Sequence, residues 1–316
     1  MTEGAPPVET HGLVKRYGEL VAVDHVELSV ERGDVFGYLG PNGAGKTTSL
    51  RMLLGLIRPT EGTARLFGRD PLVHGAKALE GVAGFVEGPR FYPYLSGRRN
   101  LRLLADYDEP LSRSRIDEVL ELVELRDRAK DKVGGYSHGM RQRLGIASAL
   151  LREPRLLLLD EPTTGLDPAG MRDMRDLVRR LAGEGITILL SSHLLYEVEE
   201  LCNRVAIVRK GRIVYQGRLR DLMATAATRY RLRALEPERA RAALLAQAGV
   251  ADLELRAGEL RFSADEDAVV ALTVALGQAG IGFTALVPET ASLEELFLGL
   301  TDGESSDHDR AAVVAV

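Results

Sequence analysis

The fold is decided by one stretch of the chain, Gly40-Pro41-Asn42-Gly43-Ala44-Gly45-Lys46-Thr47-Thr48. This stretch follows the short apolar run Val35–Leu39, which is typical of a central strand, and it opens a helical run at Ser49. Glycines here let successive backbone N–H groups point at anionic oxygens, and the helix N-terminus adds a favourable dipole. Lys46 supplies positive charge for phosphate oxygens, and the Thr47 hydroxyl is placed to hold Mg²⁺. The stretch therefore predicts a nucleoside triphosphate site between a strand and a helix.

Other apolar runs predict a parallel sheet around this stretch. Residues 156–159 and 186–190 are almost entirely apolar, and helical patterns separate them. Strands of this kind belong to parallel sheets that are covered on both faces. One helical pattern places four apolar residues on one face of an amphipathic helix: Ile116, Val119, Leu120 and Val123.

Two segments predict antiparallel strands. Residues 21–30 (VAVDHVELSV) alternate apolar and polar side chains, as a half-buried antiparallel strand does. Residues 205–208 and 213–215 flank Lys210-Gly211-Arg212, which indicates a hairpin.

Two acidic residues, Asp160 and Glu161, follow the apolar run that ends at Leu159. The carboxyl ends of parallel strands are where α/β sheets bind ligands. We expect Asp160 to orient Mg²⁺, directly or through water, and Glu161 to be the general base that activates the attacking water. The structural alternative is a strand that ends in a solvated acidic turn, and the phosphate-type loop upstream favours the site.

The composition limits the class of protein. The chain has 316 residues with 41 Lys and Arg against 46 Asp and Glu, a formal net charge of −5. Proteins that bind nucleic acid usually have more basic than acidic residues, so we expect no nucleic-acid partner. Cys202 is the only cysteine, and its apolar neighbours predict a buried thiol. The N-terminus lacks a signal-peptide pattern, and no apolar run of about 18 residues predicts a transmembrane helix.

After Arg220 the pattern predicts a second, smaller domain. The predicted segments are a strand at 230–234, a helix at 237–247, a hairpin at 253–262 turning at Ala257-Gly258, a helix at 266–279, a strand at 282–287 and a helix at 292–300. This is the split βαβ order, strand-helix-strand-strand-helix-strand. Its role is predicted as bracing or dimerisation rather than ligand sensing.

A third segment, Tyr136-Ser137-His138-Gly139-Met140, precedes an apolar helical run. Alone it is typical of a helix N-cap. In order with the loop at 40–48 and the acids at 160 and 161, it makes residues 8 to 217 resemble the ATP-binding subunits of ABC transporters, in which this segment is the signature motif. The resemblance implies an α/β fold: a P-loop NTPase mixed sheet with antiparallel β and α-helical subdomains, here followed by the small α+β (βαββαβ) domain.

The resemblance also implies the domain bounds and the ligands. We expect an ABC ATP-binding domain over residues 1–219 with a helical subdomain at about 88–150, an accessory domain over 220–301 and a flexible tail over 302–316. ATP and Mg²⁺ are the implied cofactors, and Lys46, Glu161 and His193 the implied catalytic residues. The implied ATP-binding residues are Tyr17, which stacks on adenine, the loop Gly40, Pro41, Asn42, Gly43, Ala44, Gly45, Lys46, Thr47 and Thr48, and Ser137, Gly139 and Asp167 at the dimer interface. For Tyr17, a core aromatic on a strand is the alternative.

The single copy of each motif implies a homodimer with ATP sandwiched between its subunits. The family also implies a separate transmembrane permease subunit, and hence a peripheral place on the cytoplasmic face of the membrane. We expect ATP hydrolysis to drive export of a drug, an antibiotic or a lipid-like substrate, although no residue excludes import. The alternative is a soluble ABC-type ATPase that acts as a nucleotide switch on a non-transport macromolecular partner.

The chain departs from the family pattern at Glu87. The family usually carries a glutamine there, in the coupling loop, and Glu87 is implied as a Mg²⁺ ligand in its place. His138 and Met140 also replace commoner residues of the signature. A glutamate in the coupling loop is similar to the subgroup that exports bacitracin-type and anthracycline-type antibiotics.

Just downstream, Phe91-Tyr92-Pro93-Tyr94-Leu95 is rich in aromatic residues for a chain with 5% aromatics. Two interpretations remain open: a groove that receives a short helix of the membrane partner, or a contact that fixes the helical subdomain to the sheet.

Overall fold

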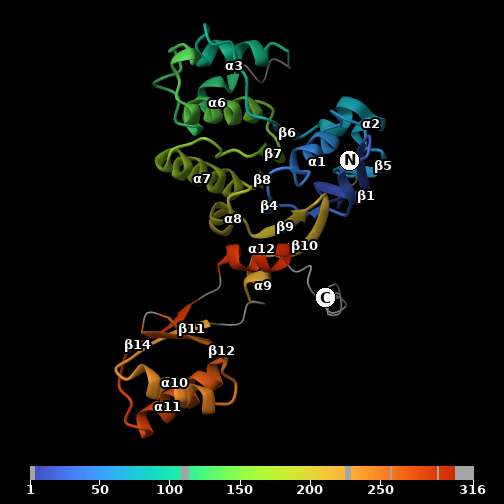
Figure 1. Cartoon of the computed structure of the whole chain (residues 1–316). Coiled ribbons are helices and arrows are strands. Elements are labelled where there is room, and N and C mark those ends of the chain that lie inside the picture. The colour runs from blue at the N-terminus through green and yellow to red at the C-terminus, as the bar shows by residue number, and fades with distance from the viewer. Residues whose placement is uncertain (1–3, 108–113, 225–228, 257, 290–291, 303–316) are drawn as a thin grey trace. The chain divides into compact units, whose positions relative to one another are not determined.

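The computed structural model describes residues 4–107, 114–224, 229–256, 258–289 and 292–302. The chain divides into two compact units, Met1–Leu219 and Arg220–Val316 (Figure 1).

The first unit is built on a six-stranded sheet in the order β10-β9-β4-β8-β7-β6. Its strands are β4 (Val35–Leu39), β6 (Val82–Phe85), β7 (Leu156–Asp160), β8 (Thr187–Ser192), β9 (Arg204–Arg209) and β10 (Arg212–Arg218). All pairs are parallel except β9 with β10, which form the predicted hairpin. Every residue of β4, β7 and β8 is buried, because these strands lie inside the sheet and are covered on both faces. The predicted parallel sheet is confirmed.

A second, antiparallel sheet of the first unit contains β1 (Val8–Tyr17), β2 (Leu20–Val26), β3 (Ser29–Val30) and β5 (Glu61–Leu66). The prediction of one strand over residues 21–30 was wrong, since the chain is interrupted between β2 and β3. Thr10 explains the interruption: its hydroxyl donates to the carbonyl of Val26 at 2.8 Å and accepts the N–H of Leu28 at 2.8 Å. A side chain thus replaces ladder hydrogen bonds at this point.

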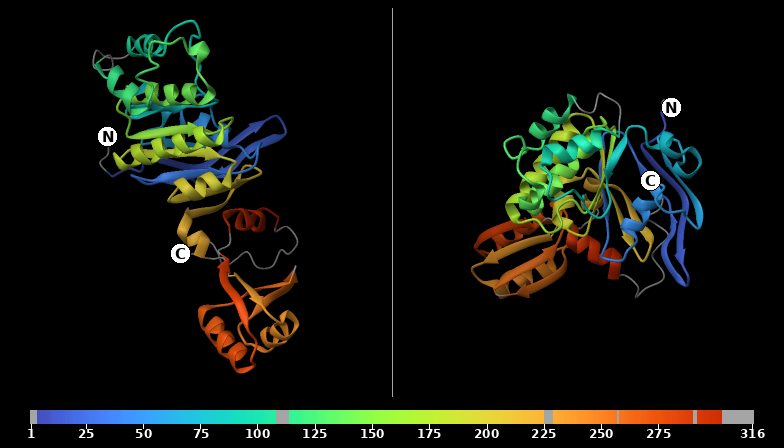
Figure 2. Two further views of the ribbon diagram at one scale, coloured as in Figure 1. Left: turned by 90° about the vertical axis from the view of Figure 1, so that its left-hand side faces the viewer. Right: turned by 90° about the horizontal axis from the view of Figure 1, so that it is seen from above.

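Helices cover the central sheet and form a subdomain at its β6 end (Figures 1 and 2). The helical segments of the first unit are α1 (Lys46–Leu53), α2 (Pro71–His74), η1 (Gly75–Leu79), α3 (Gly97–Ala105), α5 (Ile116–Leu122), η2 (Val133–Gly135), α6 (His138–Leu150), α7 (Pro168–Gly183) and α8 (Leu195–Leu201). The next helix, α9 (Leu219–Ala224), begins at the last residue of the first unit and continues into the second. In α5 the predicted apolar face is buried, and its helix packs against α3 and α6. The amphipathic helix is confirmed.

The second unit has the predicted βαββαβ order. Its elements are β11 (Arg229–Ala234), α10 (Pro237–Ala246), β12 (Ala251–Arg256), β13 (Glu259–Ser263), α11 (Glu266–Gln278), β14 (Phe283–Glu289) and a final α12 (Leu293–Asp302). The strands form an antiparallel sheet in the order β12-β13-β11-β14, and α10 and α11 pack with it in one apolar core. Of the predicted turn, Ala257 lies outside the described residues, as does the predicted tail from residue 303 onward.

Cys202 lies at the end of α8, in the core of the first unit. Burial raises the pKa of its thiol, with a smaller contribution from the carboxylate of Glu197. A β-carbon added to Gly37 of β4 would lie 3.1 Å from Cys202 Sγ, so the thiol packs on the strand as a small apolar group. The predicted buried thiol is confirmed.

No helix in the described part of the chain has both the length and the apolar run that crossing a bilayer requires.

Candidate functional site

The loop between β4 and α1 is closed by the side chain of Lys46. Its ammonium group donates to the carbonyl of Gly40 at 2.7 Å and to that of Pro41 at 3.2 Å. Lys46 is only 5% exposed, so its charge is held inside the loop rather than in solvent. A cation fixed at this place strengthens the attraction of the loop for anions.

Glycine is required at two positions of the loop by close backbone contacts. A β-carbon at Gly40 would lie 2.5 Å from the carbonyl oxygen of Val208, and one at Gly45 would lie 2.3 Å from that of Ala22. Gly45 also has a φ of 102°, in the left-handed region, where it precedes α1 as the N-cap. The backbone can therefore fold tightly around a phosphate group at the start of the helix.

A pocket of about 300 Å³ opens over this loop. It is lined by Tyr17, Leu20, Ala22, Asn42, Gly43, Ala44, Gly45, Lys46, Thr47, Thr48 and Glu161. Tyr17 ends β1, and 48% of its surface is exposed. The alternative interpretation, a core aromatic residue, requires a buried ring and does not fit this exposure. An exposed ring at the wall of a pocket offers a face on which a flat base can stack.

Asp160 connects the loop to the central sheet. Its Oδ2 accepts the hydroxyl of Thr47 at 2.9 Å, and its Oδ1 accepts the hydroxyl of Ser191 at 2.5 Å. Ser191 is the second-last residue of the adjacent strand β8, and its oxygen in turn accepts the backbone N–H of Glu161 at 3.0 Å. The carboxyl ends of β7 and β8 thus bring a carboxylate and a hydroxyl together at one point, a set of oxygens that Mg²⁺ prefers.

Glu161 is held by three groups from three segments. Its Oε2 accepts the Thr164 hydroxyl at 2.8 Å and lies 2.7 Å from Nδ1 of His193, while its Oε1 lies 3.3 Å from Nζ of Lys46. Burial would raise the pKa of Glu161, but the Thr164 hydrogen bond and the charges of Lys46 and His193 lower the pKa below its usual value. Glu161 is therefore an ionised carboxylate at neutral pH, which can accept a proton.

The predicted interface residues lie outside this pocket. Ser137 is the N-cap of α6 and accepts the N–H of Met140 at 3.2 Å, and Asp167 caps α7 by accepting the N–H of Gly170 at 2.9 Å. A β-carbon at Gly139 would lie 3.6 Å from Leu166, so the two caps are neighbours. Two helix N-termini are thus placed side by side, and none of Ser137, Gly139 and Asp167 lines the pocket that contains Lys46.

Glu87, the third predicted Mg²⁺ ligand, forms an ion pair with an arginine of α1. Its carboxylate is hydrogen bonded by Arg51 of α1, and its side chain is 58% exposed. The pocket lining does not include it. Arg51 neutralises the charge that a glutamate adds near the phosphate loop.

The sequence interpretation missed Ser191 and Thr164 as parts of the site. Ser191 stands two residues before His193, in a segment whose histidine alone was assigned a role. Ser191 lies near the carboxyl end of β8 and Thr164 lies in the loop after β7, both at the edge where the sheet binds ligands, and that position was the available signal.

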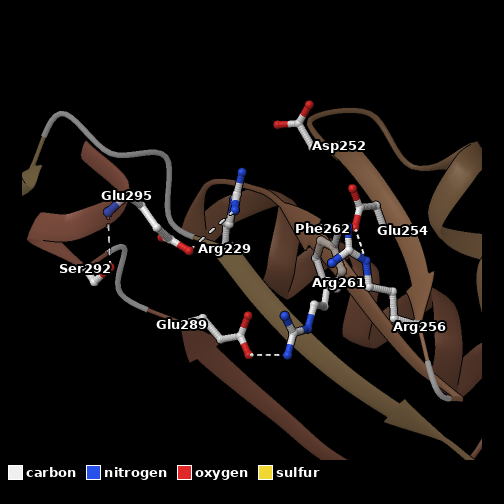
Figure 3. Close-up of a pocket in the computed structure, with 9 residues that line it drawn as sticks. All are labelled: Arg229, Asp252, Glu254, Arg256, Arg261, Phe262, Glu289, Ser292 and Glu295. Carbon is white, nitrogen blue, oxygen red and sulfur yellow. Dashed lines mark hydrogen bonds and ion pairs between the residues drawn. The ribbon is translucent and has the colours of Figure 1, made fainter. Parts of the chain in front are cut away.

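A second cavity, of about 400 Å³, lies in the second unit. Figure 3 shows it lined mainly by charged side chains, which pair with one another. Arg256 lies 2.8 Å from Glu254, Arg261 lies 3.8 Å from Glu289 and Arg229 lies 4.0 Å from Glu295. Three arginines thus face four carboxylates in the lining, and three of those carboxylates are paired with them. In the described part of the chain, no group of three or more His, Cys, Asp or Glu residues is arranged to hold a metal ion.

Comparisons with known proteins agree on one family. The model of the family described as ABC transporter matches residues 23–164. The bacitracin transport ATP-binding protein BcrA of Bacillus licheniformis is 48% identical over 208 residues, covering 66% of this chain and 68% of its own length. A daunorubicin resistance ATP-binding protein of Streptomyces coeruleorubidus is 39% identical over 302 residues, covering 93% of this chain and 95% of its own. A solved structure of an ATP-binding subunit of an ABC transporter is 30% identical with a TM-score of 0.61, covering 69% of this chain and 92% of its own.

Proposed function

This chain belongs to the ATP-binding, ATP-hydrolysing subunits of ABC transporters, and on that premise we propose that it drives export of a drug-like, antibiotic-like or lipid-like molecule through a separate membrane subunit. The observation that carries the proposal is the hydrogen-bonded set formed by Lys46, Thr47, Asp160, Glu161 and His193. The export class is supported by relatives that are named for bacitracin transport and daunorubicin resistance.

ATP binding is assigned to the loop and to Tyr17. The backbone N–H groups of residues 40–48 and the ammonium group of Lys46 bind the phosphates, and the ring of Tyr17 stacks on adenine. Thr47 and Asp160 would hold Mg²⁺, since their oxygens lie 2.9 Å apart and are of the type that this ion prefers. When bound, Mg²⁺ neutralises phosphate charge and polarises phosphoryl oxygens.

Hydrolysis is assigned to Glu161 as general base. Its ionised carboxylate takes a proton from the attacking water, and His193 keeps the carboxylate in place through Nδ1. Lys46 stabilises the charge that develops on the phosphoryl oxygens. These roles require Glu161 to lie within hydrogen-bond or ion-pair distance of both His193 and Lys46, as it does here.

A second copy of the chain is proposed to complete each ATP site. Ser137 and Gly139 stand at the N-terminus of α6, outside the pocket that contains Lys46. A helix N-terminus attracts anions, so in a head-to-tail homodimer α6 of one copy would bind the γ-phosphate held by the other. Asp167 caps the neighbouring helix α7 and would lie at the same interface.

The membrane partner is proposed to dock at the aromatic segment of residues 91–95, which would place this subunit on the cytoplasmic face of the membrane. Asn100, which is buried, fixes the backbone: it accepts the N–H of Tyr92 at 2.9 Å and donates to its carbonyl at 3.1 Å. The rings of Tyr92 and Tyr94 are 55% and 65% exposed. Exposed aromatic rings on a rigid backbone are typical anchors of protein interfaces.

Tyr92→Ala is expected to weaken recruitment to membranes about tenfold or more, because it removes an exposed anchor and leaves the backbone contacts with Asn100 in place. The measurement is the fraction of the full chain that sediments with membranes containing the permease. Tyr196→Ala is the control, since this tyrosine is 60% exposed on α8. Unchanged recruitment of Tyr92→Ala would reject the docking role.

Glu87→Ala is expected to lower transport at least about fivefold more than it lowers ATP affinity. The Glu87 side chain lies outside the ATP pocket, so its loss leaves the phosphate contacts in place. The substitution also removes the hydrogen bond between Arg51 and Glu87. The segment around residue 87, between the ATP site and the docking surface, is therefore less firmly held. Binding and efflux are measured on the same variant. Equal loss in both assays would show that Glu87 supports the ATP site rather than coupling.

The proposed export function is tested by purifying the full chain from detergent-solubilised membranes and identifying its co-purifying subunit. The pair is then produced in a susceptible host and challenged with bacitracin or daunorubicin. Resistance that disappears with Glu161→Gln supports ATP-driven export. Stable binding to ribosomes or nucleic acid without any membrane subunit would instead support the nucleotide-switch alternative. The second unit is proposed to brace or dimerise the subunit.

A further inference from the structure

Glu197 is an acidic residue buried inside the ATPase unit. It belongs to the first turn of α8 and is only 2% exposed. Its Oε2 accepts a hydrogen bond from the hydroxyl of Thr163, which is itself only 4% exposed. Nothing in the hydrolysis scheme above uses either side chain, although Thr163 stands two residues after Glu161.

The burial of Glu197 is unfavourable for folding. Its Oε1 has no hydrogen-bond partner within the described part of the chain. Burial raises the pKa of this carboxyl, which the Thr163 hydrogen bond and the charges of Arg175 and His193 only partly oppose. A half-satisfied buried carboxyl costs free energy relative to an apolar residue of similar size. Stability therefore does not explain why a glutamate is buried here, whereas a role in positioning the neighbouring loop does.

The position of Glu197 joins two loops that form the site. Thr163 lies in the loop after β7, which carries Glu161, and Glu197 lies just after the loop that follows β8, which carries His193. These loops are already connected by the 2.7 Å contact between Glu161 and His193. The Thr163–Glu197 hydrogen bond is a second connection, on the buried side of the first.

The backbone at Glu161 needs such support. Its φ of 48° lies in the left-handed region, which a residue with a side chain seldom adopts. Strained backbone of this kind persists only where the surroundings hold it. The loop has internal hydrogen bonds, from the N–H of Thr164 to the carbonyl of Glu161 at 3.2 Å and from that of Leu166 to Thr163 at 3.1 Å. Glu197 adds the anchor that fixes this loop to the neighbouring strand and helix.

We propose that Glu197 is a positioning residue for ATP hydrolysis: by holding Thr163, it fixes the loop that keeps the Glu161 carboxylate against His193. The inference rests on the proposed role of Glu161 as general base. It gives α8 an indirect part in hydrolysis, through the position of the general base.

The test measures kcat and KM for ATP on full-length variants. Glu197→Ala is expected to lower kcat about tenfold or more and to change KM by less than about threefold, since a misplaced base slows chemistry while the phosphate loop is untouched. Thr163→Val should likewise lower kcat and leave KM nearly unchanged. Glu197→Gln and Thr163→Ser keep an acceptor and a donor, and both should stay within about threefold of the unmodified chain. The double variant Glu197→Ala/Thr163→Val should be no slower than the slower single variant, because both substitutions remove the same hydrogen bond.

Val198→Ala is the matched control for stability. Val198 is the next residue of α8, is fully buried and packs on β4, where a β-carbon at Gly37 would lie 2.8 Å from it. This variant should lower the melting temperature and keep kcat. If Glu197→Ala fails to fold, the kcat values of Thr163→Val and Thr163→Ser still show whether the Thr163–Glu197 hydrogen bond supports hydrolysis.

Three outcomes would overturn the inference: an unchanged kcat for Thr163→Val, a Glu197→Gln variant as slow as Glu197→Ala, or a loss of kcat in Val198→Ala equal to that in Glu197→Ala. Failure of the proposed site is recognised separately. If Glu161→Gln hydrolyses ATP at the normal rate, the base itself is assigned wrongly. If Glu161→Gln is inactive and Thr163→Val is normal, only the role of Glu197 is rejected.

Discussion

Glu161→Gln is expected to slow ATP hydrolysis about 10²–10⁴-fold while ATP binding is kept, because an amide cannot take the proton of the attacking water. The amide oxygen can still accept the hydroxyl of Thr164, which bonds the carboxylate at 2.8 Å, so the loop keeps its shape. Removal of the carboxylate charge also removes repulsion with the γ-phosphate, so ATP affinity should be equal or higher. The measurements are steady-state phosphate release and equilibrium binding of ATP on the same sample.

Glu199→Gln is the control for this experiment. Glu199 is exposed on α8, so loss of its charge should leave both measurements unchanged. Hydrolysis by Glu161→Gln within about threefold of the normal rate would show that another group is the base. A parallel loss of ATP binding would show that Glu161 acts chiefly through its ion pair with Lys46.

Lys46→Ala is expected to weaken ATP binding at least about 100-fold, and thus to abolish hydrolysis at moderate ATP concentrations. Charge-assisted hydrogen bonds contribute about 1.5–3 kcal/mol each, so loss of one or two of them to phosphate oxygens accounts for this factor. The change also removes the donor that ties the carbonyls of Gly40 and Pro41 together, so the loop loses its closed shape. Binding is measured by titration with a fluorescent ATP analogue.

Lys77→Ala is the matched control, because Lys77 is exposed and does not line the ATP pocket. Its affinity for the analogue should equal that of the unmodified chain. If Lys46→Ala binds within about fivefold of normal, the glycine loop and the helix dipole suffice for binding, and Lys46 acts only during hydrolysis.

The parts that sequence reasoning predicted well are those determined by local pattern. Residues 35–39 and 156–159 are so apolar that only buried strands suit them, and the glycine-rich loop joins the first of these to a helix. Asp160 then follows a strand whose end must lie beside that loop in a parallel sheet, so its contact with Thr47 follows from topology. The strand order itself did not follow from any single segment.

The parts that were missed depend on contacts between distant segments. The break after Val26 is stabilised by Thr10, 16 residues away, and nothing in residues 21–30 indicates it. The contact between Arg51 and Glu87 likewise joins α1 to a loop far along the chain. Glu197 looks like any acid on a helix, because its burial depends on how α8 packs against β4, β8 and α7. Periodicity in a single sequence reports which face of a segment is apolar, and it does not report which polar atoms meet.

The buried position of Cys202 has a practical consequence for labelling. Thiol reagents react with the thiolate, and burial keeps Cys202 protonated and inaccessible. Maleimide dyes should therefore not label the unmodified chain. A cysteine introduced at an exposed position, such as that of Tyr92, would then be the single site for a dye or a cross-linker. Conformational changes can therefore be followed by fluorescence without removing the natural cysteine and the packing that it makes against Gly37.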